Sequence, residues 1–303
     1  MKTRVVVRVP ATSGNLGPGF DCLGMALDMW NSVRLEIGRD SQISIRGVGA
    51  GELSQERDNL VYRAAESVFR QAGINTPNFR LECHNKIPLS RGLGSSAAAV
   101  VGGVVAANAL LDEPLSQHEV LDLVSRLEGH PDNVTPALLG GCQIVTNSDE
   151  GLSTLAVPIP RGLFAVLFIP DQPMPTQEGR ALLSPEITRE DAVFNLGRTA
   201  LLVAAFSTGK IEYLRTATED RLHQPARQQI FPAMKYIFRA ALGAGALGVF
   251  LSGGGSTVLA LTRDRQLTIG YEMADAAVKM GSPGLIEVVR PSRRGATISR
   301  LED

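Results

Sequence analysis

The chain has 303 residues, of which 44% are apolar and 20% are charged. This length exceeds what one hydrophobic core usually supports, so we expect two packed domains. The 30 Lys and Arg residues balance the 31 Asp and Glu residues, and a net charge of −1 gives no general field that would attract nucleic acid or an anionic membrane.

Cysteine usage and hydropathy indicate a cytoplasmic protein. Cys22, Cys83 and Cys142 are odd in number and far apart, which argues against a disulfide scaffold and against a structural zinc site. The longest apolar runs are shorter than the ~20 residues that a membrane span needs. No basic segment followed by an apolar stretch opens the sequence, so we expect no secretory signal.

The first part of the chain alternates short strands, glycine-rich segments and helices. Period-two alternation marks the strands, and longer apolar stretches mark the helices. A glycine-rich segment, Ala11–Asp21, follows the first strand, which we expect Pro10 to end. The expected elements are a strand Val5–Val9, a strand near Ser32–Ile37, a helix Leu60–Ala72, a strand over Phe79–Cys83 and a small-residue helix Ala97–Leu111.

The next helix has clear start and stop signals. Ser116 and Glu119 have the spacing of a capping box, and Gly129-His130-Pro131 is expected to stop the helix. Its apolar stripe is formed by Val120, Leu121, Val124 and Leu127.

The second part of the chain begins after a polar, proline-containing stretch, Asn147–Arg161, where we place the domain boundary (1–155 and 156–303). The mixed order of strands and helices predicts α+β structure in both halves rather than a doubly wound sheet. The expected elements are a buried strand Leu163–Ile169, helices near Asp191–Ser207 and Pro232–Leu242, a strand–turn–strand over Val249–Leu261, a helix Gln266–Met280 and two terminal strands.

A second glycine-rich loop, Pro88–Ala98, lies between a predicted strand and a predicted helix. Glycines let the main chain approach a ligand, and the first amides of the helix have no intrahelical acceptor, so the place suits a polyphosphate. No lysine follows Gly94, which excludes a Walker A loop, and the spacing does not fit a dinucleotide-binding loop. A simple turn is the alternative, although the tandem serines and the alanine-rich helix argue against it.

Glu128 falls on the apolar stripe of its helix, four residues after Val124. A buried carboxylate normally pairs with a cation or a metal, and Mg²⁺ shared with ATP would satisfy it. Periodicity alone leaves an alternative open, in which Glu128 lies at the end of the helix and its side chain reaches water.

Three motifs together resemble the GHMP kinase superfamily and, within it, the homoserine kinases. They are Val9–Gly24, Pro88–Ala98 and Leu251–Val258. The narrower resemblance is carried by Asn15–Asp21, Glu128–Val134 and Thr176–Arg180. The resemblance covers essentially the whole chain. It implies an α+β, two-domain GHMP kinase fold, with an N-terminal ATP-binding domain like ribosomal protein S5 domain 2 and a ferredoxin-like C-terminal domain.

The resemblance also implies a nucleotide site. Ser96 and Glu128 would hold Mg²⁺, and Asn59, Leu60 and Val61 would line the adenine pocket. The loop residues that would hold the triphosphate of ATP are Pro88, Leu89, Ser90, Arg91, Gly92, Leu93, Gly94, Ser95, Ser96, Ala97 and Ala98.

For the second substrate, L-homoserine, the resemblance places Asn15, Asp21 and Asn133 around the amino and hydroxyl groups. Arg180 and Arg227 would bind the carboxylate, with Gly254 close to the substrate. A zwitterion needs partners of both charges, which agrees with this set. The alternatives are a turn for Asn15, a helix cap for Asp21 and solvated surface positions for the two arginines.

The implied activity is ATP-dependent phosphorylation of the homoserine hydroxyl to O-phosphohomoserine in threonine biosynthesis, with Asn133, Glu128 and Ser96 as catalytic residues. The expected partners are ATP and L-homoserine, a homodimer is allowed, and neither nucleic acid nor membrane is expected. A related kinase for mevalonate or shikimate and a non-catalytic ATP sensor are the competing hypotheses. The paired arginines with Asp21 argue against the first, and Ser96, Glu128 and the intact loop argue against the second.

Overall fold

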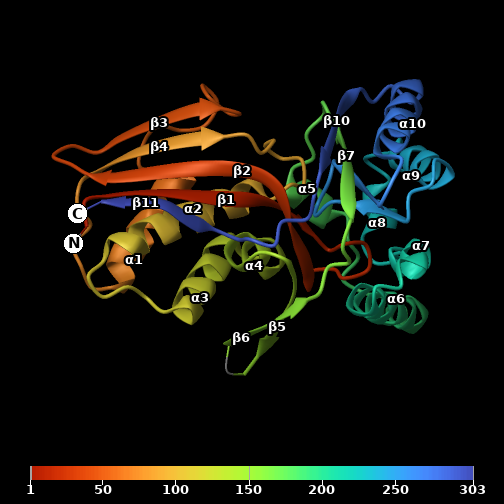
Figure 1. Cartoon of the computed structure of the whole chain (residues 1–303), viewed down its shortest axis with the longest axis horizontal. Helices are drawn as coiled ribbons and strands as arrows, with labels where there is room; N and C mark the ends of the chain where they lie inside the picture. Colours follow the sequence, from red (N-terminus) through yellow and green to blue (C-terminus); the bar gives the residue numbers. More distant parts are fainter. Residues whose placement is uncertain (1, 150, 303) are drawn as a thin grey trace.

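The computed structural model describes residues 2–149 and 151–302, and it shows two neighbouring α+β parts, each with its own sheet (Figure 1). The two-domain α+β class predicted from the sequence is confirmed. None of the helices in the described ranges is long and apolar enough to cross a membrane.

The first part is built on a seven-stranded sheet with the order β11-β1-β2-β4-β3, in which β5 pairs with the start of β2 and β6 pairs with β5. Only β3 and β4 are parallel to each other. Its strands are β1 (Arg4–Gly14), β2 (Leu23–Ile37), β3 (Gln42–Gly47), β4 (Phe79–Asn85), β5 (Cys142–Ser148), β6 (Gly151–Val157) and β11 (Thr297–Glu302).

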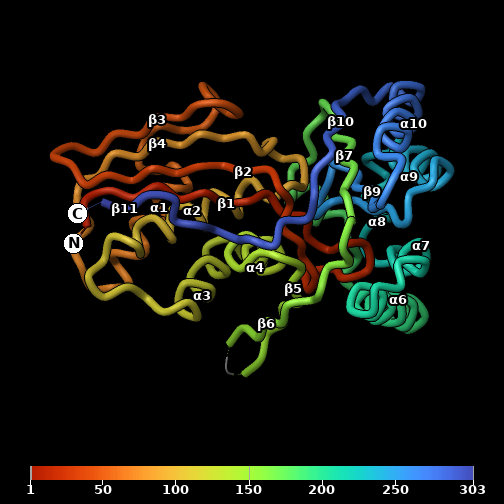
Figure 2. The backbone as a smooth tube through the Cα atoms, in the orientation of Figure 1, coloured from red at the N-terminus to blue at the C-terminus, as the bar shows by residue number. Residues whose placement is uncertain are grey.

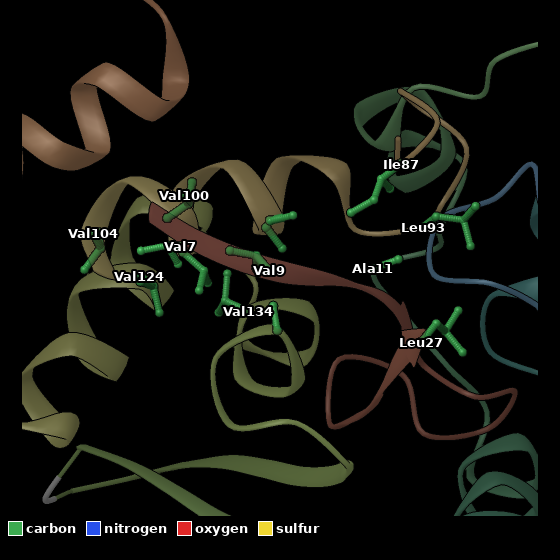
Figure 3. Close-up of a cluster of buried hydrophobic side chains, with 14 of the residues drawn as sticks. Val7, Val9, Ala11, Leu27, Ile87, Leu93, Val100, Val104, Val124 and Val134 are labelled. Atoms are coloured by element: carbon green, nitrogen blue, oxygen red, sulfur yellow. The ribbon is translucent and has the colours of Figure 1, made fainter. Parts of the chain in front are cut away.

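Side-chain alternation gives the strands of this sheet one buried face. Val5, Val7 and Val9 of β1 are fully buried, whereas Arg4 lies on the opposite face and pairs with Glu36 of β2. A sheet that is covered on one side reads as apolar residues alternating with polar ones, as observed here. Figure 3 shows Val7 and Val9 of the strand close to valines of the surrounding helices, among them Val100, Val124 and Val134.

Pro10 does not end the first strand, contrary to the sequence prediction. β1 continues to Gly14, and its register against β2 shifts between Pro10 and Ala11. A proline is tolerated in a strand at such an irregularity, because the hydrogen bond it cannot donate is already missing there.

Four helices cover the buried face of the first sheet (Figure 1). The central helix, α2 (Ser95–Leu110), has small residues along its length. A Cβ at its Gly103 would lie 2.4 Å from the carbonyl oxygen of Val61 in α1 (Leu60–Gln71), so glycine allows α1 and α2 to pack closely. The four helices are α1 (Leu60–Gln71), α2 (Ser95–Leu110), α3 (Gln117–Glu128) and α4 (Pro131–Leu139).

The predicted capping box of α3 is confirmed, since the Ser116 and Glu119 side chains each bond the other residue's main chain. Leu127 was wrongly placed in the buried stripe: it is 38% exposed, and Leu123 is buried instead. α3 ends before Gly129-His130-Pro131, as predicted. Pro131 also begins α4, because proline fits the first position of a helix.

The second part has a four-stranded antiparallel sheet with the order β10-β7-β9-β8. In chain order this is a β-α-β-β-α-β arrangement, the ferredoxin-like topology. Its strands are β7 (Phe164–Pro170), β8 (Gly248–Leu251), β9 (Val258–Thr262) and β10 (Gly284–Val289). Its helices are α5 (Thr176–Ala181), α6 (Arg189–Thr208), η1 (Ile211–Tyr213), α7 (Leu214–Ala217), α8 (Gln224–Arg227), α9 (Met234–Gly243) and α10 (Gln266–Lys279).

Both faces of the second sheet are covered. α9 and α10 pack on one face, and residues of β7 and β9 on the other face join the core of the first part. β7 is therefore buried on both sides, which agrees with its continuous apolar sequence.

The chain crosses between the two parts twice, from β6 to β7 and from β10 back to β11 (Figure 2). The predicted boundary between residues 155 and 156 falls inside β6. β11 pairs with β1, so the last strand of the chain belongs to the first sheet although the predicted division by position places it in the second domain.

Candidate active site

A cavity with about 730 Å³ of empty space, part of it open to solvent, lies where the two parts meet. The first part contributes the segment after β1, the loop between β4 and α2, and the junction of α3 and α4. The second part contributes α5, the end of α8 and the loop between β8 and β9. A ligand that fills this cavity would therefore contact both parts.

The loop between β4 and α2 has its carbonyl groups occupied. The oxygens of Ser90, Arg91 and Leu93 accept hydrogen bonds from the main-chain amides of residues 174, 257 and 12, at 3.0–3.1 Å. The oxygen of Gly92 accepts from the Ser252 hydroxyl at 2.7 Å. Since the carbonyls are turned away from the cavity that the loop lines, the amide groups are the polar main-chain atoms left for a ligand.

The loop runs directly into the N-terminus of α2. Gly94 is the residue before the helix and has a positive φ of 67°, and no side chain in the described part of the protein caps the helix there. The first helical hydrogen bond runs from Ala98 to Gly94, which leaves three earlier amides without an intrahelical acceptor. Together with the helix dipole, they form a site for an anion.

Arg91 does not direct its guanidinium toward these amides. It donates to the carbonyl oxygens of Pro170 at 2.7 Å, Leu89 at 3.0 Å and Asp171. The side chain therefore fastens the loop to the end of β7 in the second part. Burial lowers its pKa, and Asp171 opposes this shift.

Ser96 and Glu128 meet at the edge of the cavity. The Ser96 hydroxyl in the first turn of α2 donates to Oε2 of Glu128, the last residue of α3, at 2.8 Å. Burial raises the pKa of Glu128, and the hydrogen bond from Ser96 lowers it. The pair offers two hard oxygen ligands of the kind that Mg²⁺ prefers.

α4 places Asp132 and Asn133 beside the end of β1. The Asn133 Oδ1 accepts from the Thr12 hydroxyl at 2.9 Å. Asp132 is 2% exposed, and its Oδ1 has no hydrogen-bond partner among the described residues. Burial, and next the charge of Asp21, raise the pKa of Asp132 to about 7. A Cβ at Gly14 would overlap both side chains, so glycine makes room for them.

Asp21 and Arg180 form a bidentate ion pair across the cavity, with distances of 3.0 and 2.5 Å. Asn15 supports this pair: its Oδ1 accepts from the Asp21 amide at 3.0 Å, and its Nδ2 donates to the Gly253 carbonyl at 2.9 Å. Asn15 thus ties the glycine-rich segment to the loop of the second part, while Asp21 and Arg180 present opposite charges to the cavity.

Arg227 also lines the cavity, and it is only 1% exposed. Burial, and then the nearby Arg180, lower its pKa to about 10. The Nε atoms of Arg180 and Arg227 are both buried and find no acceptor within residues 2–149 and 151–302. Two unpaired guanidinium donors in one cavity favour an anionic ligand group.

A second cavity, with about 930 Å³ of empty space, shares Ser90, Ser95 and Ser96 with the first. It is lined by Asn59, Leu60 and Val61 at the start of α1. The Asn59 amide is already used, because it caps α1 and donates to the Ser54 carbonyl at 2.7 Å. Its part in this cavity is therefore to fix the main chain.

The structure brings most of the predicted site residues together. Asn15, Asp21, residues 90–96, Glu128, Asn133, Arg180, Arg227 and Gly254 line the first cavity, and Leu89 with residues 59–61 lines the second. Pro88, Ala97 and Ala98 line neither; the two alanines are fully buried beneath the loop.

Sequence reasoning missed three residues of this region. Asp132 precedes Asn133 and had a detectable signal, a second carboxylate in the Glu128–Val134 motif. Thr176 and His130 also line the cavity, and neither was among the predicted site residues. Burial, and then Arg180, lower the pKa of His130.

Comparisons with known proteins show the family of the chain. The chain matches the family "GHMP kinases N terminal domain" over residues 59–141 and "GHMP kinases C terminal" over residues 202–276. It is 43% identical to a homoserine kinase of Moorella thermoacetica over 97% of this chain and 99% of that protein. It is 44% identical to one of Carboxydothermus hydrogenoformans over 96% of each.

Solved structures show the same fold. A homoserine kinase from Cytophaga hutchinsonii superposes with a TM-score of 0.89 at 30% identity, covering 98% of each chain. A mevalonate kinase from L. major, at 17% identity, has a TM-score of 0.70 over 96% of each chain; this likeness concerns the fold alone.

Proposed function

The chain belongs to the homoserine kinases of the GHMP kinase superfamily, and from that premise we propose that it transfers the γ-phosphoryl group of ATP to the hydroxyl of L-homoserine. The product is O-phosphohomoserine, an intermediate of threonine biosynthesis. One observation carries the proposal: a cavity with unpaired guanidinium donors and a carboxylate adjoins a loop that exposes its main-chain amides.

The charges of the cavity match an amino-acid zwitterion. Arg180 and Arg227 would bind the carboxylate through the donors that lack a protein acceptor in the described residues. Asp21 would bind the ammonium group, and this contact would replace part of its ion pair with Arg180. Each charge-assisted contact contributes ~1.5–3 kcal/mol, which is enough for a small ligand to be selected by its charges.

ATP is proposed to extend from the second cavity to the first. The adenine would lie near residues 59–61, and the triphosphate would cross the serines that the two cavities share. The amides of the loop and of the first turn of α2 would hold the phosphates. This path brings the γ-phosphate to the cavity that holds Asn133 and Arg180.

Ser96 and Glu128 fit a magnesium ion. No cluster of three or more His, Cys, Asp or Glu side chains suited to a metal occurs in the described ranges. A cation held here would take most of its ligands from phosphate oxygens and water, as Mg²⁺ commonly does in kinases. When bound, Mg²⁺ neutralises charge on the phosphates of ATP.

The chain's own residues act by positioning. Asn133 would orient the attacking hydroxyl, and its amide cannot serve as a base. Phosphoryl transfer passes through a loose transition state in which orientation and charge neutralisation dominate, so a strong base is not required. We propose that the hydroxyl proton leaves to a phosphate oxygen or to solvent.

We also propose that the enzyme works in the cytoplasm. Its three cysteines are free, and Cys83 and Cys142 are buried. Burial raises the pKa of each of these two thiols to about 12, so both remain protonated. Unpaired cysteines are the common state in a reducing compartment.

The test is an ADP-release assay with homoserine, mevalonate, shikimate and galactose as acceptors. The proposal predicts that homoserine has the highest kcat/KM by at least about a hundredfold, since the other alcohols lack the zwitterion. Preference for another acceptor would contradict the substrate assignment. ATP binding without turnover of any acceptor would favour a sensor.

A further inference from the structure

His223 lies directly behind Arg227 and has no role in the function proposed so far. It precedes α8, is 0% exposed, and stacks on Phe20 with the ring centroids 5.3 Å apart. Phe20 also lies within 6 Å of the Arg227 guanidinium. The histidine is therefore part of the wall that holds this arginine.

The two contacts of the imidazole ring determine its tautomer. Nδ1 lies 2.6 Å from a terminal nitrogen of Arg227, and since a guanidinium only donates, Nδ1 must accept. Nε2 lies 2.7 Å from the carbonyl oxygen of Gly17, and since a carbonyl only accepts, Nε2 must carry the hydrogen. Both partners require the neutral ring with hydrogen on Nε2.

The surroundings are consistent with a neutral ring. The pKa of His223 is lowered to about 4, with burial as the largest cause; Arg227 acts in the same direction, whereas Asp220, the bond to Gly17 and Asp21 act in the opposite direction. Asp220 lies 3.5 Å from Nε2, but its carboxylate already accepts main-chain amides, including those of His223 and Gln224. It acts as the cap of α8 and leaves the Nε2 hydrogen to Gly17.

The position of Gly17 is itself fixed by packing. It has a positive φ of 87°, and a Cβ there would lie 2.5 Å from the Thr218 carbonyl oxygen. His223 thus connects a constrained point of the glycine-rich segment to Arg227 by two hydrogen bonds in line.

These contacts orient the guanidinium of Arg227. One terminal nitrogen is held by His223 and by the Gly253 carbonyl at 3.1 Å, while Nε, on the other edge, has no acceptor within the part of the chain that the structure describes. An arginine that is already fixed along one edge loses little further side-chain freedom when its remaining donors bind a carboxylate.

We propose that His223 is a positioning residue that accepts a hydrogen bond from Arg227 and so determines the affinity of the site for the carboxylate of the amino-acid substrate. This inference rests on the proposed function, in which Arg227 binds that carboxylate.

Two substitutions of His223 test its hydrogen bonds to Arg227 and to Gly17 separately. In His223→Asn, the amide oxygen takes the place of Nδ1 and accepts from Arg227, but no atom reaches Gly17. In His223→Gln, the longer side chain reaches Gly17 as a donor, but no acceptor occupies the Nδ1 position. The exposed His118 on α3, whose side chain is 61% exposed, gives a matched control, His118→Gln.

Steady-state kinetics of these variants give the expected split. His223→Gln should raise the KM for homoserine by about tenfold or more, as expected when an arginine loses a buried acceptor, and leave the KM for ATP within about twofold. His223→Asn should raise the KM for homoserine less, and His118→Gln should resemble the wild type. Equal effects of the two His223 variants, or a parallel rise in both KM values, would overturn the inference.

A measurement on the unaltered protein covers the case in which a variant fails to fold. Long-range ¹H–¹⁵N correlation spectra of the ¹⁵N-histidine-labelled wild type report which ring nitrogen carries the hydrogen. The inference requires the Nε2–H tautomer for His223 at neutral pH, and a ring protonated on Nδ1 would overturn it. An unaltered protein that fails to phosphorylate homoserine would instead contradict the proposed function, so the two failures are distinguishable.

Discussion

The two halves of the cleft present positive charge in different ways. The loop between β4 and α2 does so with main-chain amides, because its carbonyls are bonded to other segments. The other half does so with two guanidinium groups, Arg180 and Arg227, which are balanced by the carboxylate of Asp21.

This difference predicts that the two halves of the cleft are sensitive to different kinds of mutation. Main-chain amides carry no ionisable group, so the loop depends on backbone shape and on the absence of Cβ atoms at its glycines. The substrate half depends on charge, burial and side-chain partners. Mutations that add one carbon atom should damage the first half, and mutations that remove a charge should damage the second.

The largest expected effect is that of Gly92→Ala. Gly92 has a φ of +71°, and its Cβ would lie 2.0 Å from the Ser252 carbonyl oxygen, so the loop must move away from the second part. We expect kcat/KM for ATP to fall by about a thousandfold, corresponding to ~4 kcal/mol.

Gly73→Ala is the matched control. Gly73 has nearly the same φ, +69°, but a Cβ there would meet no atom of the described residues within 4 Å. It should cost ~1 kcal/mol of stability and leave ATP binding intact. A Gly92→Ala enzyme that binds ATP normally would show that the main-chain shape of the loop is not what matters.

Glu128→Gln tests the place where the two halves meet. The amide keeps the size of the side chain but loses the charge that would hold Mg²⁺, so kcat should fall by a hundred- to a thousandfold, or ~3–4 kcal/mol. Asp122→Asn on the same helix, where Asp122 pairs with the exposed His118, should keep full activity. Unchanged activity of Glu128→Gln would refute the metal assignment.

Arg180→Leu tests the substrate half alone. It removes one proposed partner of the substrate carboxylate and takes the Arg180 partner away from Asp21. The KM for homoserine should therefore rise by about ten- to a hundredfold, with the KM for ATP nearly constant. Arg198→Leu, which removes an arginine paired with Glu219 on the surface, serves as the control. An effect on ATP alone would contradict the placement of Arg180.

The smallest effect concerns the pH dependence of stability. The pKa of Asp132 is raised to about 7 in the folded protein, compared with about 3.9 in an unfolded chain. Between these values the folded protein binds a proton that the unfolded chain has released, so the free energy of unfolding falls as pH rises. The fall should be ~2 kcal/mol between about pH 5.5 and pH 8.5.

Asp132→Asn should abolish this part of the pH dependence, which urea unfolding at the two pH values measures for variant and wild type. A difference between the two proteins that does not change with pH would mean that Asp132 is ionised throughout. In that case Asp132 would add a full negative charge to the substrate half of the cleft.

Local sequence patterns predicted much of the fold. The capping box of α3 needs only residues three apart, and the alternating valines of β1 need only their neighbours. The misreadings also have local causes. Pro10 was read as the end of the first strand, but a register shift accommodates it. Leu127 was read as part of the buried stripe of α3, where Leu123 is buried instead.

The candidate site was less predictable, since its contacts are long-range. Arg180 and Asp21 are 159 residues apart, and only a motif resemblance placed both in one site. Asp132 is buried because Gly14, on another element, leaves room for it. His223 acquires its tautomer from Gly17 and Arg227, and no pattern around His223 itself indicates this.

The most direct test of the account is a crystal structure with a non-hydrolysable ATP analogue and homoserine. The account predicts that the phosphates accept hydrogen bonds from the amides of residues 94–97, while Arg91 stays on the carbonyls of Pro170 and Asp171. Phosphates bound by the Arg91 guanidinium, or lying away from this loop, would contradict it.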